Sequence, residues 1–430
     1  MKKSIRILLL VVLVAVFAII LTGKPQSGNP SADVKSDASG IVTRAAGREK
    51  TDPELEARRK RSIDLAAQKW YEELLEKYPD MKPVYRDVPD EKNGYLQLLQ
   101  LAESMEKPPL DDELKDMISG AAGEWDAGKF KAWQSENQWY FDELLRIAEL
   151  PDRSTKGIAM DRIFGAPARY GSVFGSILRA SARVAFENGD QETALRHLKA
   201  STAIGDHIVD TEVTSMLGEV ISVGIRNSAR DLLQVNFLPV LANDPESLSR
   251  WNEVVFRNEK PAAEYARVIA GEWNASIRSL ILPALLGDPS AVESLPVGEV
   301  HDVEELLGSY TRMLQQTAEG IQHSGSDRFD VERATDAFPP AESLVNRTGE
   351  ESHKVTAEGM LMSLRGLPVA FGKSTTRTAM ASAAISILLG EEPPVDPVSG
   401  EAFVWNAETR TLSAPGDGEE FEPIVVPGGH

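Results

Sequence analysis

The chain has 430 residues, of which 42% are hydrophobic and 26% are charged, as in a globular protein that can bury one large or two medium cores. Its formal net charge of -20 repels nucleic acid and anionic surfaces at long range, so no nucleic-acid partner is expected. The absence of cysteine excludes disulfides, thiolate zinc sites, a thiol nucleophile and a cysteine-linked lipid.

Residues 1–22 have the pattern of a secretory signal or a membrane anchor. Lys2, Lys3 and Arg6 precede an unbroken apolar run over residues 7–21, and positive charge of this kind stays on the cytoplasmic side. No small-residue cleavage motif follows the run. We therefore expect a retained transmembrane helix, a signal anchor in the inner membrane of the cell envelope, with an extracytoplasmic body. Cleavage as a signal peptide, followed by export, is the alternative.

The next segments read as a linker and an N-terminal helical region over residues 52–165. Residues 23–51 are rich in Gly, Pro, Ser, Asp and Lys, which predicts a flexible linker. A helical spacing of apolar residues then predicts a first long helix ending near Tyr78. Its expected stripe is Leu55, Ile63, Leu65, Ala66, Trp70, Leu74 and Leu75.

A second stripe predicts one helix that runs to about Leu150 and buries its aromatic residues in a core. The stripe consists of Phe130, Trp133, Tyr140, Phe141, Leu144, Leu145 and Ala148. Trp139 does not fit the spacing of this stripe and is the aromatic residue of this segment that is available for a role outside the core.

Residues 166–390 are expected to form the main helical domain. Two antiparallel helices should meet at the turn Asn188–Asp190, and a third should follow over residues 213–233, where Gly218 and Gly224 allow close backbone approach. Further helices are expected over residues 245–257, 261–286, 300–322, 341–364 and 375–389. No second copy of the helical pair is found, which does not favour a tetratricopeptide array.

Residues 391–430 should form a small C-terminal β-hairpin after Pro393 and Pro394. Strands are expected over residues 402–405 and 409–412, with a possible third strand at 424–426. Phe403 and Trp405 would share one face and pack on the helix over residues 375–389, as an appendage to the helical core. The fold class is therefore all-α, mainly antiparallel helical hairpins or a bundle, with this hairpin added.

Several segments, in this order, resemble a known group of proteins. They are Pro89–Asn93, Leu178–Asp190, Ala194–Leu198, and Asp396–Gly400 before Phe403. The chain resembles the poorly characterised membrane-anchored helical proteins of planctomycete-type bacteria, which share an N-terminal span, a helical body and a C-terminal D-P-x-S-G hairpin. The resemblance implies a fold and a location, but no activity and no site residues.

The hairpin is in turn similar to the C-terminal module of type II secretion pseudopilins, in which a D-P-x-G-x-P turn precedes an acidic calcium loop. Here only residues 390–394 separate the last helix from the hairpin, a shorter segment than in that pattern. This departure does not favour a pilin-like assembly.

No catalytic and no cofactor-binding residue is assigned from the sequence. Phe371–Thr375 ends like a phosphate-binding loop, but the glycine that should stand at position 367 is Leu367, and a helix N-terminus capped by Ser374 is the better interpretation. The six histidines show no H-E-x-x-H spacing. They are His197, His207, His301, His323, His353 and His430.

Other patterns also favour ordinary structure over chemistry. Ser104–Lys107 matches S-x-x-K, but two prolines directly follow it, and Gly171–Gly175 has its serine one place early for a nucleophile elbow. The carboxylates of Asp142 and Glu143 should be solvated, as should the acidic stretch after His301. A weak calcium candidate is the acidic loop with Asp417, Glu419 and Glu420, which supplies few of the oxygens calcium needs.

The sequence thus predicts a non-enzymatic, envelope-facing scaffold or protein-interaction protein, held to the membrane through its N-terminal span and binding protein partners without a cofactor. The alternative is an extracytoplasmic hydrolase whose site is assembled from residues distant in sequence. Perturbed carboxylates or histidines in a cleft would favour the enzyme, and an exposed apolar surface would favour the scaffold.

Overall fold

The computed structural model describes most of the chain from residue 53 onward. The described residues are 53–104, 109–120, 124–163, 166–255, 261–288, 307–308, 311, 314–315, 330–332, 351–416 and 421–428. The expected span (1–22), the linker (23–51) and most of the helix expected over 300–322 lie outside them. In the described part, no helix has the length and the apolar character that a membrane crossing needs.

The described residues fall into two compact units, and the smaller one is built around α2 (Pro53–Lys77). In this unit α2 packs against η5 (Ile277–Ile281) and α14 (Leu282–Leu285). The buried stripe of α2 is Ile63, Ala67 and Tyr71, at a spacing of four residues.

The stripe expected for this helix was wrong in part. Leu55 and Leu65 are 61% and 73% exposed, because the face of α2 that meets η5 and α14 is the one that carries Ile63 and Tyr71. The guanidinium of Arg278 lies 5.5 Å from the centre of the Tyr71 ring on that face.

The larger unit begins with short helices. They are α3 (Gly94–Glu103), α4 (Asp112–Ser119), α5 (Ala127–Glu136), α6 (Gln138–Ala148) and α7 (Met160–Ile163). The single helix expected up to Leu150 is therefore two, broken at Asn137, whose side-chain amide donates to the Trp133 carbonyl. Tyr140 and Phe141 on α6 are still buried, whereas Trp139 is 62% exposed, as its place off the stripe predicts.

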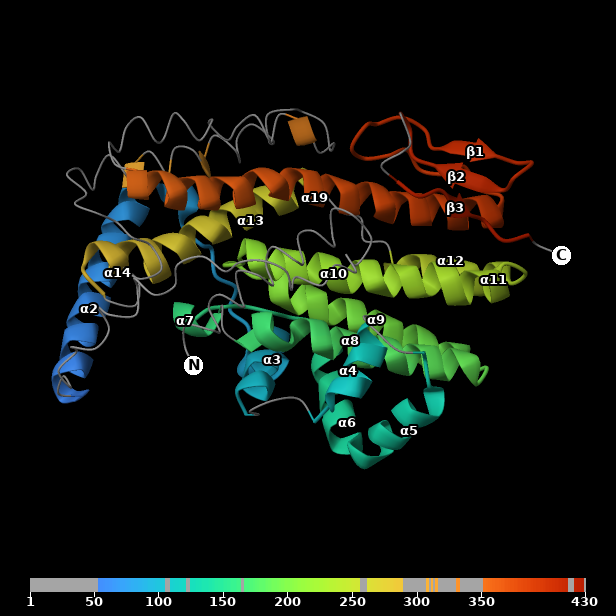
Figure 1. The fold of residues 1–430 in the computed structure, drawn as a ribbon, viewed down its shortest axis with the longest axis horizontal. Helices are drawn as coiled ribbons and strands as arrows, with labels where there is room; N and C mark the ends of the chain where they lie inside the picture. The colour runs from blue at the N-terminus through green and yellow to red at the C-terminus, as the bar shows by residue number, and fades with distance from the viewer. Residues whose placement is uncertain are drawn as a thin grey trace, which may run out of the picture. The chain divides into compact units, whose positions relative to one another are not determined.

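Three long helices form the centre of this unit: α8 (Ala166–Glu187), α9 (Gln191–Val209) and α10 (Met216–Leu232). They lie side by side (Figure 1). Gly189 takes a positive φ of 81° in the turn between α8 and α9, and the Asp190 carboxylate caps α9 by accepting from the Thr193 amide at 3.0 Å. The predicted antiparallel pair and its turn are confirmed.

The close backbone approach lies at a different glycine from the ones expected. A Cβ on Gly205 of α9 would stand 3.4 Å from both the Cα and the carbonyl oxygen of Ser222 on α10, whereas Gly224 faces open space. The expectation for Gly224 was wrong, because that residue is on the side of α10 turned away from α9. At Gly218 the neighbour is an Ile208 side chain and not backbone.

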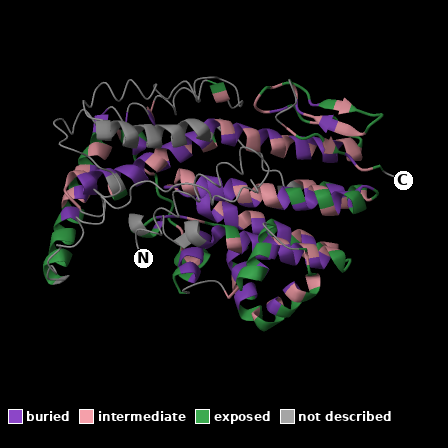
Figure 2. Ribbon diagram, viewed as in Figure 1, coloured by how far each residue is buried: buried purple, intermediate pink, exposed green. Residues whose placement is uncertain are grey.

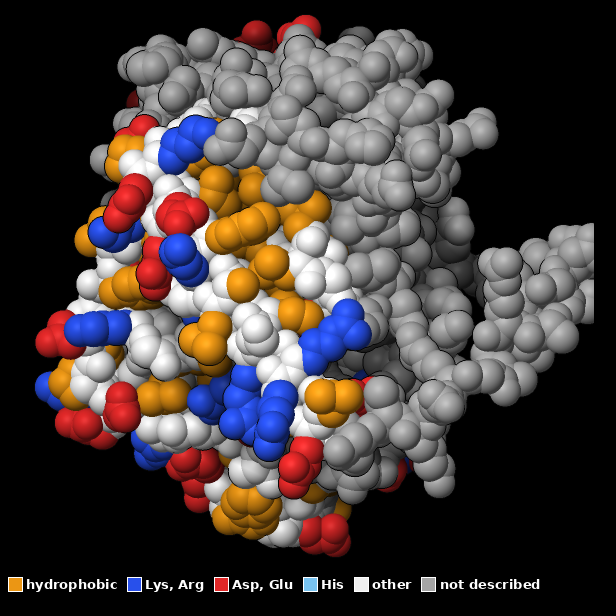
Figure 3. Space-filling model, turned by 90° about the vertical axis from the view of Figure 1, so that its left-hand side faces the viewer, with side chains coloured by type: hydrophobic (Ala, Val, Ile, Leu, Met, Phe, Trp, Pro, Cys, Tyr) orange, Lys and Arg blue, Asp and Glu red, His pale blue; other side chains and the backbone are white. Residues whose placement is uncertain are grey.

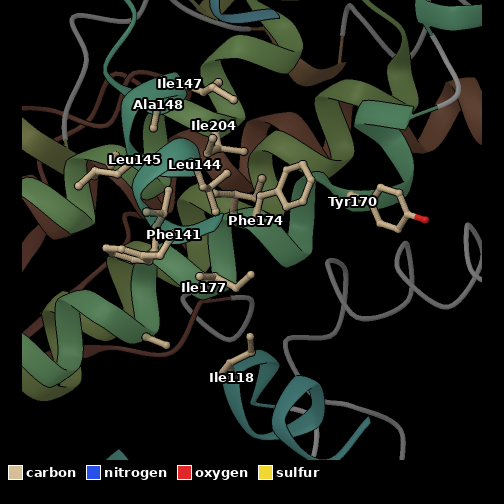
Figure 4. Close-up of a cluster of buried hydrophobic side chains, with 14 of the residues drawn as sticks. Ile118, Phe141, Leu144, Leu145, Ile147, Ala148, Tyr170, Phe174, Ile177 and Ile204 are labelled. Atoms are coloured by element: carbon tan, nitrogen blue, oxygen red, sulfur yellow. The ribbon is translucent and has the colours of Figure 1, made fainter. Parts of the chain in front are cut away.

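The apolar core of this unit lies where α8 and α9 meet α3, α4, α5 and α6 (Figure 4). Figure 2 shows the buried residues running along the facing sides of these helices. A second cluster gathers Phe237 and Trp251 with the C-terminal half of α8. It includes residues of η4 (Leu233–Phe237), α11 (Leu238–Leu241) and α12 (Pro245–Val255). The chain continues into α13 (Pro261–Ser276).

The last helix is α19 (Glu351–Leu389), which contains Pro368 in its interior. From residue 351 onward, the two helices expected over 341–364 and 375–389 form one helix. Ser374 is therefore no N-cap, and its hydroxyl donates to the Asn227 side-chain oxygen at 3.2 Å. A proline interrupts one helical hydrogen bond. Contacts of α19 with α10 and α12 supply packing that a short local pattern does not reveal.

A three-stranded antiparallel sheet follows, in the order β1 (Val404–Asn406), β2 (Thr411–Ser413), β3 (Ile424–Val425). Trp405 pairs with Leu412, which pairs with Ile424, so these three side chains share the face that packs on α19. There they meet Met380, Ala383 and Ala384. The predicted hairpin and its possible third strand are confirmed, although β1 and β2 each begin two residues later than expected. The predicted packing of Phe403 and Trp405 on the last helix is confirmed.

Candidate functional site

The calcium candidates Asp417, Glu419 and Glu420 lie outside the described residues, as does the acidic stretch after His301. Phe371–Thr375 is in the interior of α19, with Phe371 buried against the Tyr265 ring at 5.7 Å between centroids. A helix interior offers no loop of amides for phosphate, because its N–H groups are already bonded. Phe371–Thr375 therefore does not form a phosphate-binding loop.

The Asp396–Gly400 segment is a closed turn held by a buried carboxylate. Oδ1 of Asp396 accepts from the Thr376 hydroxyl at 2.9 Å and from the Val398 amide at 3.1 Å, and Oδ2 accepts from the Ser399 amide at 3.0 Å. Gly400 closes the turn with a φ of 72° and an amide bonded to the Asp396 carbonyl. The carboxylate therefore fastens the sheet to α19.

A cluster of charged side chains lies at the C-terminal end of α9. Glu212 is nearly enclosed, with 4% of its side chain exposed. Its Oε1 accepts from the amide and Nε of Arg86 at 2.9 and 3.0 Å, and its Oε2 accepts from the Thr155 amide at 2.8 Å. Burial by itself raises the pKa of a carboxyl, but these hydrogen bonds outweigh it and hold the pKa of Glu212 below its usual range.

Asp210 continues this arginine–carboxylate network. Its two oxygens accept from Nε of Arg153 at 2.9 Å and from Nη1 of Arg267 at 2.5 Å. Arg267 also lies 3.5 Å from Glu264, within the same helix α13. A carboxylate at a helix C-terminus is unfavourable for the helix dipole, and the two guanidiniums offset that cost.

The network ties together segments that are far apart in sequence. Arg226 on α10 reaches Asp206 on α9 at 3.2 Å and Glu264 on α13 at 3.7 Å. Arginine remains protonated at any pH of interest, so it does not exchange protons as an acid or base. The arrangement orders a junction between helices and loops. Sequence reasoning missed it, because no spacing along the chain marks partners drawn from so many segments.

His207, beside this network, is buried with a defined tautomer. Its Nε2 is 2.9 Å from the Ile147 carbonyl oxygen, which only accepts, so Nε2 carries the hydrogen. Burial lowers the pKa of His207 to about 4, and the positive charge of Arg153 acts in the same direction. The imidazole is therefore neutral at pH 7.

A serine and a histidine meet between α8 and α9. The Ser181 hydroxyl lies 2.9 Å from Nδ1 of His197, and the edge of the His197 ring contacts Phe141. Such a pair could activate a nucleophile. Here both residues are buried, so the serine is turned into the helix interface, and the bond satisfies two polar groups that packing has enclosed.

The remaining carboxylates singled out from the sequence are engaged at the surface. Asp142 accepts from Gln138 at 2.7 Å, and Glu143 pairs with Arg146 at 2.6 Å, which confirms that they are solvated. Within the described ranges, no three His, Asp or Glu side chains come close enough to hold a metal ion. The expectation that the whole chain binds no metal stays a prediction.

The outer face of the C-terminal sheet is a candidate interaction surface. Alternation along the strands turns Val404, Asn406, Thr411 and Val425 away from α19. Val404 and Val425 are 58% and 70% exposed and lie on the two outer strands. The inner face, by contrast, is closed against α19 by Leu412.

Compared with protein-family models, with curated proteins and with solved structures, the chain matches none of them.

Proposed function

We propose that this protein is a non-enzymatic helical scaffold of the cell envelope, anchored through residues 1–22, which binds a protein partner through the outer face of its C-terminal sheet. The observation that carries the proposal is the contrast between the two faces of that sheet. Leu412 is fully buried against α19, whereas Val404 and Val425 are exposed. Exposed apolar side chains on a short sheet suit a binding surface.

The buried polar clusters support the scaffold over the hydrolase. Glu212, Asp210 and Asp396 each accept from donors of the protein itself, and the Ser181–His197 pair lies between two helices. These groups hold segments together, as a rigid scaffold requires. The resemblance to anchored planctomycete-type proteins, and the charged and apolar pattern of residues 1–22, support the anchored, extracytoplasmic location.

Site-specific photo-crosslinking in the native envelope tests the proposal. A photoreactive amino acid at Val404 or Val425 should capture a discrete partner. A matched control is Val235, an equally exposed valine, 72% accessible, on η4. Capture of the same partner from all three positions, or from Val235 alone, would contradict the assignment to the sheet. A mature N-terminus within residues 23–51 would contradict the anchor.

A further inference from the structure

The sequence contains two Asn-Gly pairs, Asn93–Gly94 and Asn188–Gly189. In such a pair the glycine nitrogen can attack Cγ of the asparagine side chain, because glycine has no side chain to obstruct the approach. As the new N–Cγ bond forms, the Cγ–Nδ2 bond breaks, and the side-chain nitrogen takes up the glycine proton and leaves as ammonia. Water then opens the resulting succinimide ring to aspartate or isoaspartate. The two pairs share this chemistry, so only the structure around each pair separates them.

The first pair, Asn93–Gly94, is enclosed and hydrogen-bonded at both reacting groups. Asn93 is 3% exposed. Its Oδ1 accepts from the amides of Leu96 and Ser154 at 3.2 and 3.1 Å, and its Nδ2 donates to the Ser154 carbonyl at 2.9 Å. The Gly94 nitrogen donates to the Asp152 carbonyl at 2.8 Å. The glycine nitrogen cannot attack Cγ unless these bonds break together.

A wider network holds the segment that encloses this first pair. The Ser154 hydroxyl donates to the Arg86 carbonyl at 3.0 Å, and Arg86 in turn binds Glu212 through its amide and Nε. Gly94 lies against His207, so the pair is at the C-terminal end of α9, which is the left-hand end in Figure 1. Figure 3 draws that side of the molecule and shows Lys and Arg side chains beside Asp and Glu there. The first pair is therefore released only by extensive unfolding.

The second pair, Asn188–Gly189, lies at the opposite end of α9, in the turn that joins it to α8, and both residues are exposed. The Lys131 ammonium donates to Oδ1 of Asn188 at 2.9 Å, in a contact open to water. The Gly189 nitrogen donates to the Phe186 carbonyl at 2.9 Å, in the last turn of α8. A helix end opens at a smaller cost in free energy than a buried segment does. Opening of this one turn therefore frees the glycine nitrogen to attack.

We propose that Asn188 is a site of spontaneous deamidation in the folded protein, whereas Asn93 is protected until the protein unfolds. The aspartate product places a carboxylate beside the Lys131 ammonium and keeps the turn. The isoaspartate product adds a methylene group to the main chain directly before Gly189, whose φ of 81° belongs to the tight turn. Deamidation thus gives a second form of the connection between α8 and α9, with one more negative charge. This chemistry depends neither on the anchor nor on the outer face of the C-terminal sheet.

The test follows both pairs in the purified full-length protein, which is kept at physiological temperature and pH. Samples are digested at acidic pH, where the reaction is slow, and mass spectrometry measures the deamidated fraction of the peptides that contain Asn93 or Asn188. In the folded protein this fraction should grow many-fold faster at Asn188 than at Asn93. In denaturing urea the two fractions should grow at similar rates, because glycine follows the asparagine in both pairs.

Variants test the role of the turn. Asp190→Ala removes the carboxylate that caps α9 and should raise the rate at Asn188 several-fold without changing the rate at Asn93. Asp126→Ala removes the corresponding cap of α5, and as the matched control it should change neither rate. Asn188→Gln should abolish the modification at that position, because the longer side chain has to close a larger ring.

Equal rates at the two positions of the folded protein would overturn the proposal, as would a position 188 that stays unmodified until urea is added. A rate at Asn188 that is unchanged in Asp190→Ala would show that opening of the turn does not control the reaction, which also contradicts the proposal. If Asp190→Ala does not fold, as judged by helical circular dichroism, the comparison of the two pairs in the wild type decides alone.

Discussion

The imidazole of His207 lies directly against the backbone of Gly94. A Cβ at position 94 would stand 2.3 Å from Cε1 of that ring, a separation that no side chain tolerates. Gly94 is the first residue of α3, and its amide donates to the Asp152 carbonyl at 2.8 Å. Nε2 of the His207 ring is held by the Ile147 carbonyl oxygen at 2.9 Å. Because glycine has no side chain, the first residue of α3 can lie directly against the imidazole of His207 on α9.

Gly94→Ala should therefore destabilise the protein by about 1–3 kcal/mol, because a buried ring must move to accept the methyl group. Gly224→Ala is the matched control in the interior of α10. It meets no atom within 4 Å and should stabilise by up to about 1 kcal/mol through helix propensity. Urea unfolding monitored by circular dichroism measures both, and equal effects would contradict the close contact.

The folded protein should lose stability as the pH falls from about 6.5 to about 4, in part through His207. Its pKa is lowered to about 4 from 6.5, so between these values the unfolded chain binds the proton and the folded chain does not. The stabilisation is complete above pH 6.5 and decreases toward pH 4, by about 3 kcal/mol in all.

The measurement is the free energy of unfolding at several pH values for the wild type and for His207→Gln. The slope between pH 4 and 6.5 should be smaller in the variant. It should not vanish, because burial also lowers the pKa of His197, which acts in the same direction. An unchanged slope would show that His207 is protonated or exposed in the folded protein.

Glu212→Gln should destabilise the protein by about 2–4 kcal/mol, since it leaves an amide NH2 among donors from Arg86 and Thr155. Its control, Glu149→Gln, breaks an ion pair with Arg196 in which both side chains are substantially exposed, and should cost less than about 1 kcal/mol. Thermal and denaturant unfolding compare the two. The difference should shrink as the pH falls below 4.5, because Glu212 of the unfolded chain then takes up a proton, whereas folded Glu212, whose pKa is lowered, does so only at a lower pH.

Asp396→Asn should loosen the sheet without unfolding the helices. The amide group replaces one acceptor oxygen, so either the Thr376 hydroxyl or the backbone of the turn loses its partner. Hydrogen exchange should speed up over residues 396–414 while helical circular dichroism is kept. Glu408→Gln, in the exposed turn between β1 and β2, should change neither. Global unfolding of the Asp396→Asn variant would mean that the sheet is part of the main core.

Ser181→Ala should cost about 1–2 kcal/mol, because Nδ1 of the buried His197 loses its hydrogen-bond partner. Ser172→Ala, at an exposed position of the same helix, should be neutral or slightly stabilising. Neither change should alter any ester hydrolysis by the purified protein. A hydrolysis rate that disappears in Ser181→Ala alone would favour the hydrolase over the scaffold.

Features that depend on neighbours along the chain could be predicted from the sequence. The turn at Asn188–Asp190 follows from a glycine that adopts positive φ and an aspartate that caps the next helix. A strand that includes Leu412 was likewise expected from its neighbours along the chain, over 409–412, two residues before β2 begins. The spacing of apolar residues predicts the mostly helical fold class in the same way, because apolar residues recur along a helix or a strand at the interval typical of that element.

Tertiary structure alone decided which of several faces is buried and which polar groups meet. Leu65 fits a helical stripe as well as Ile63 does, but only the position of η5 and α14 determines that Leu65 is exposed. Pro368 marks a helix end locally, yet contacts with α10 and α12 hold α19 through it. Asp210 finds Arg153 and Arg267 57 residues away in each direction. Contacts over such distances leave no periodic trace in the sequence, because folding and not spacing brings them together.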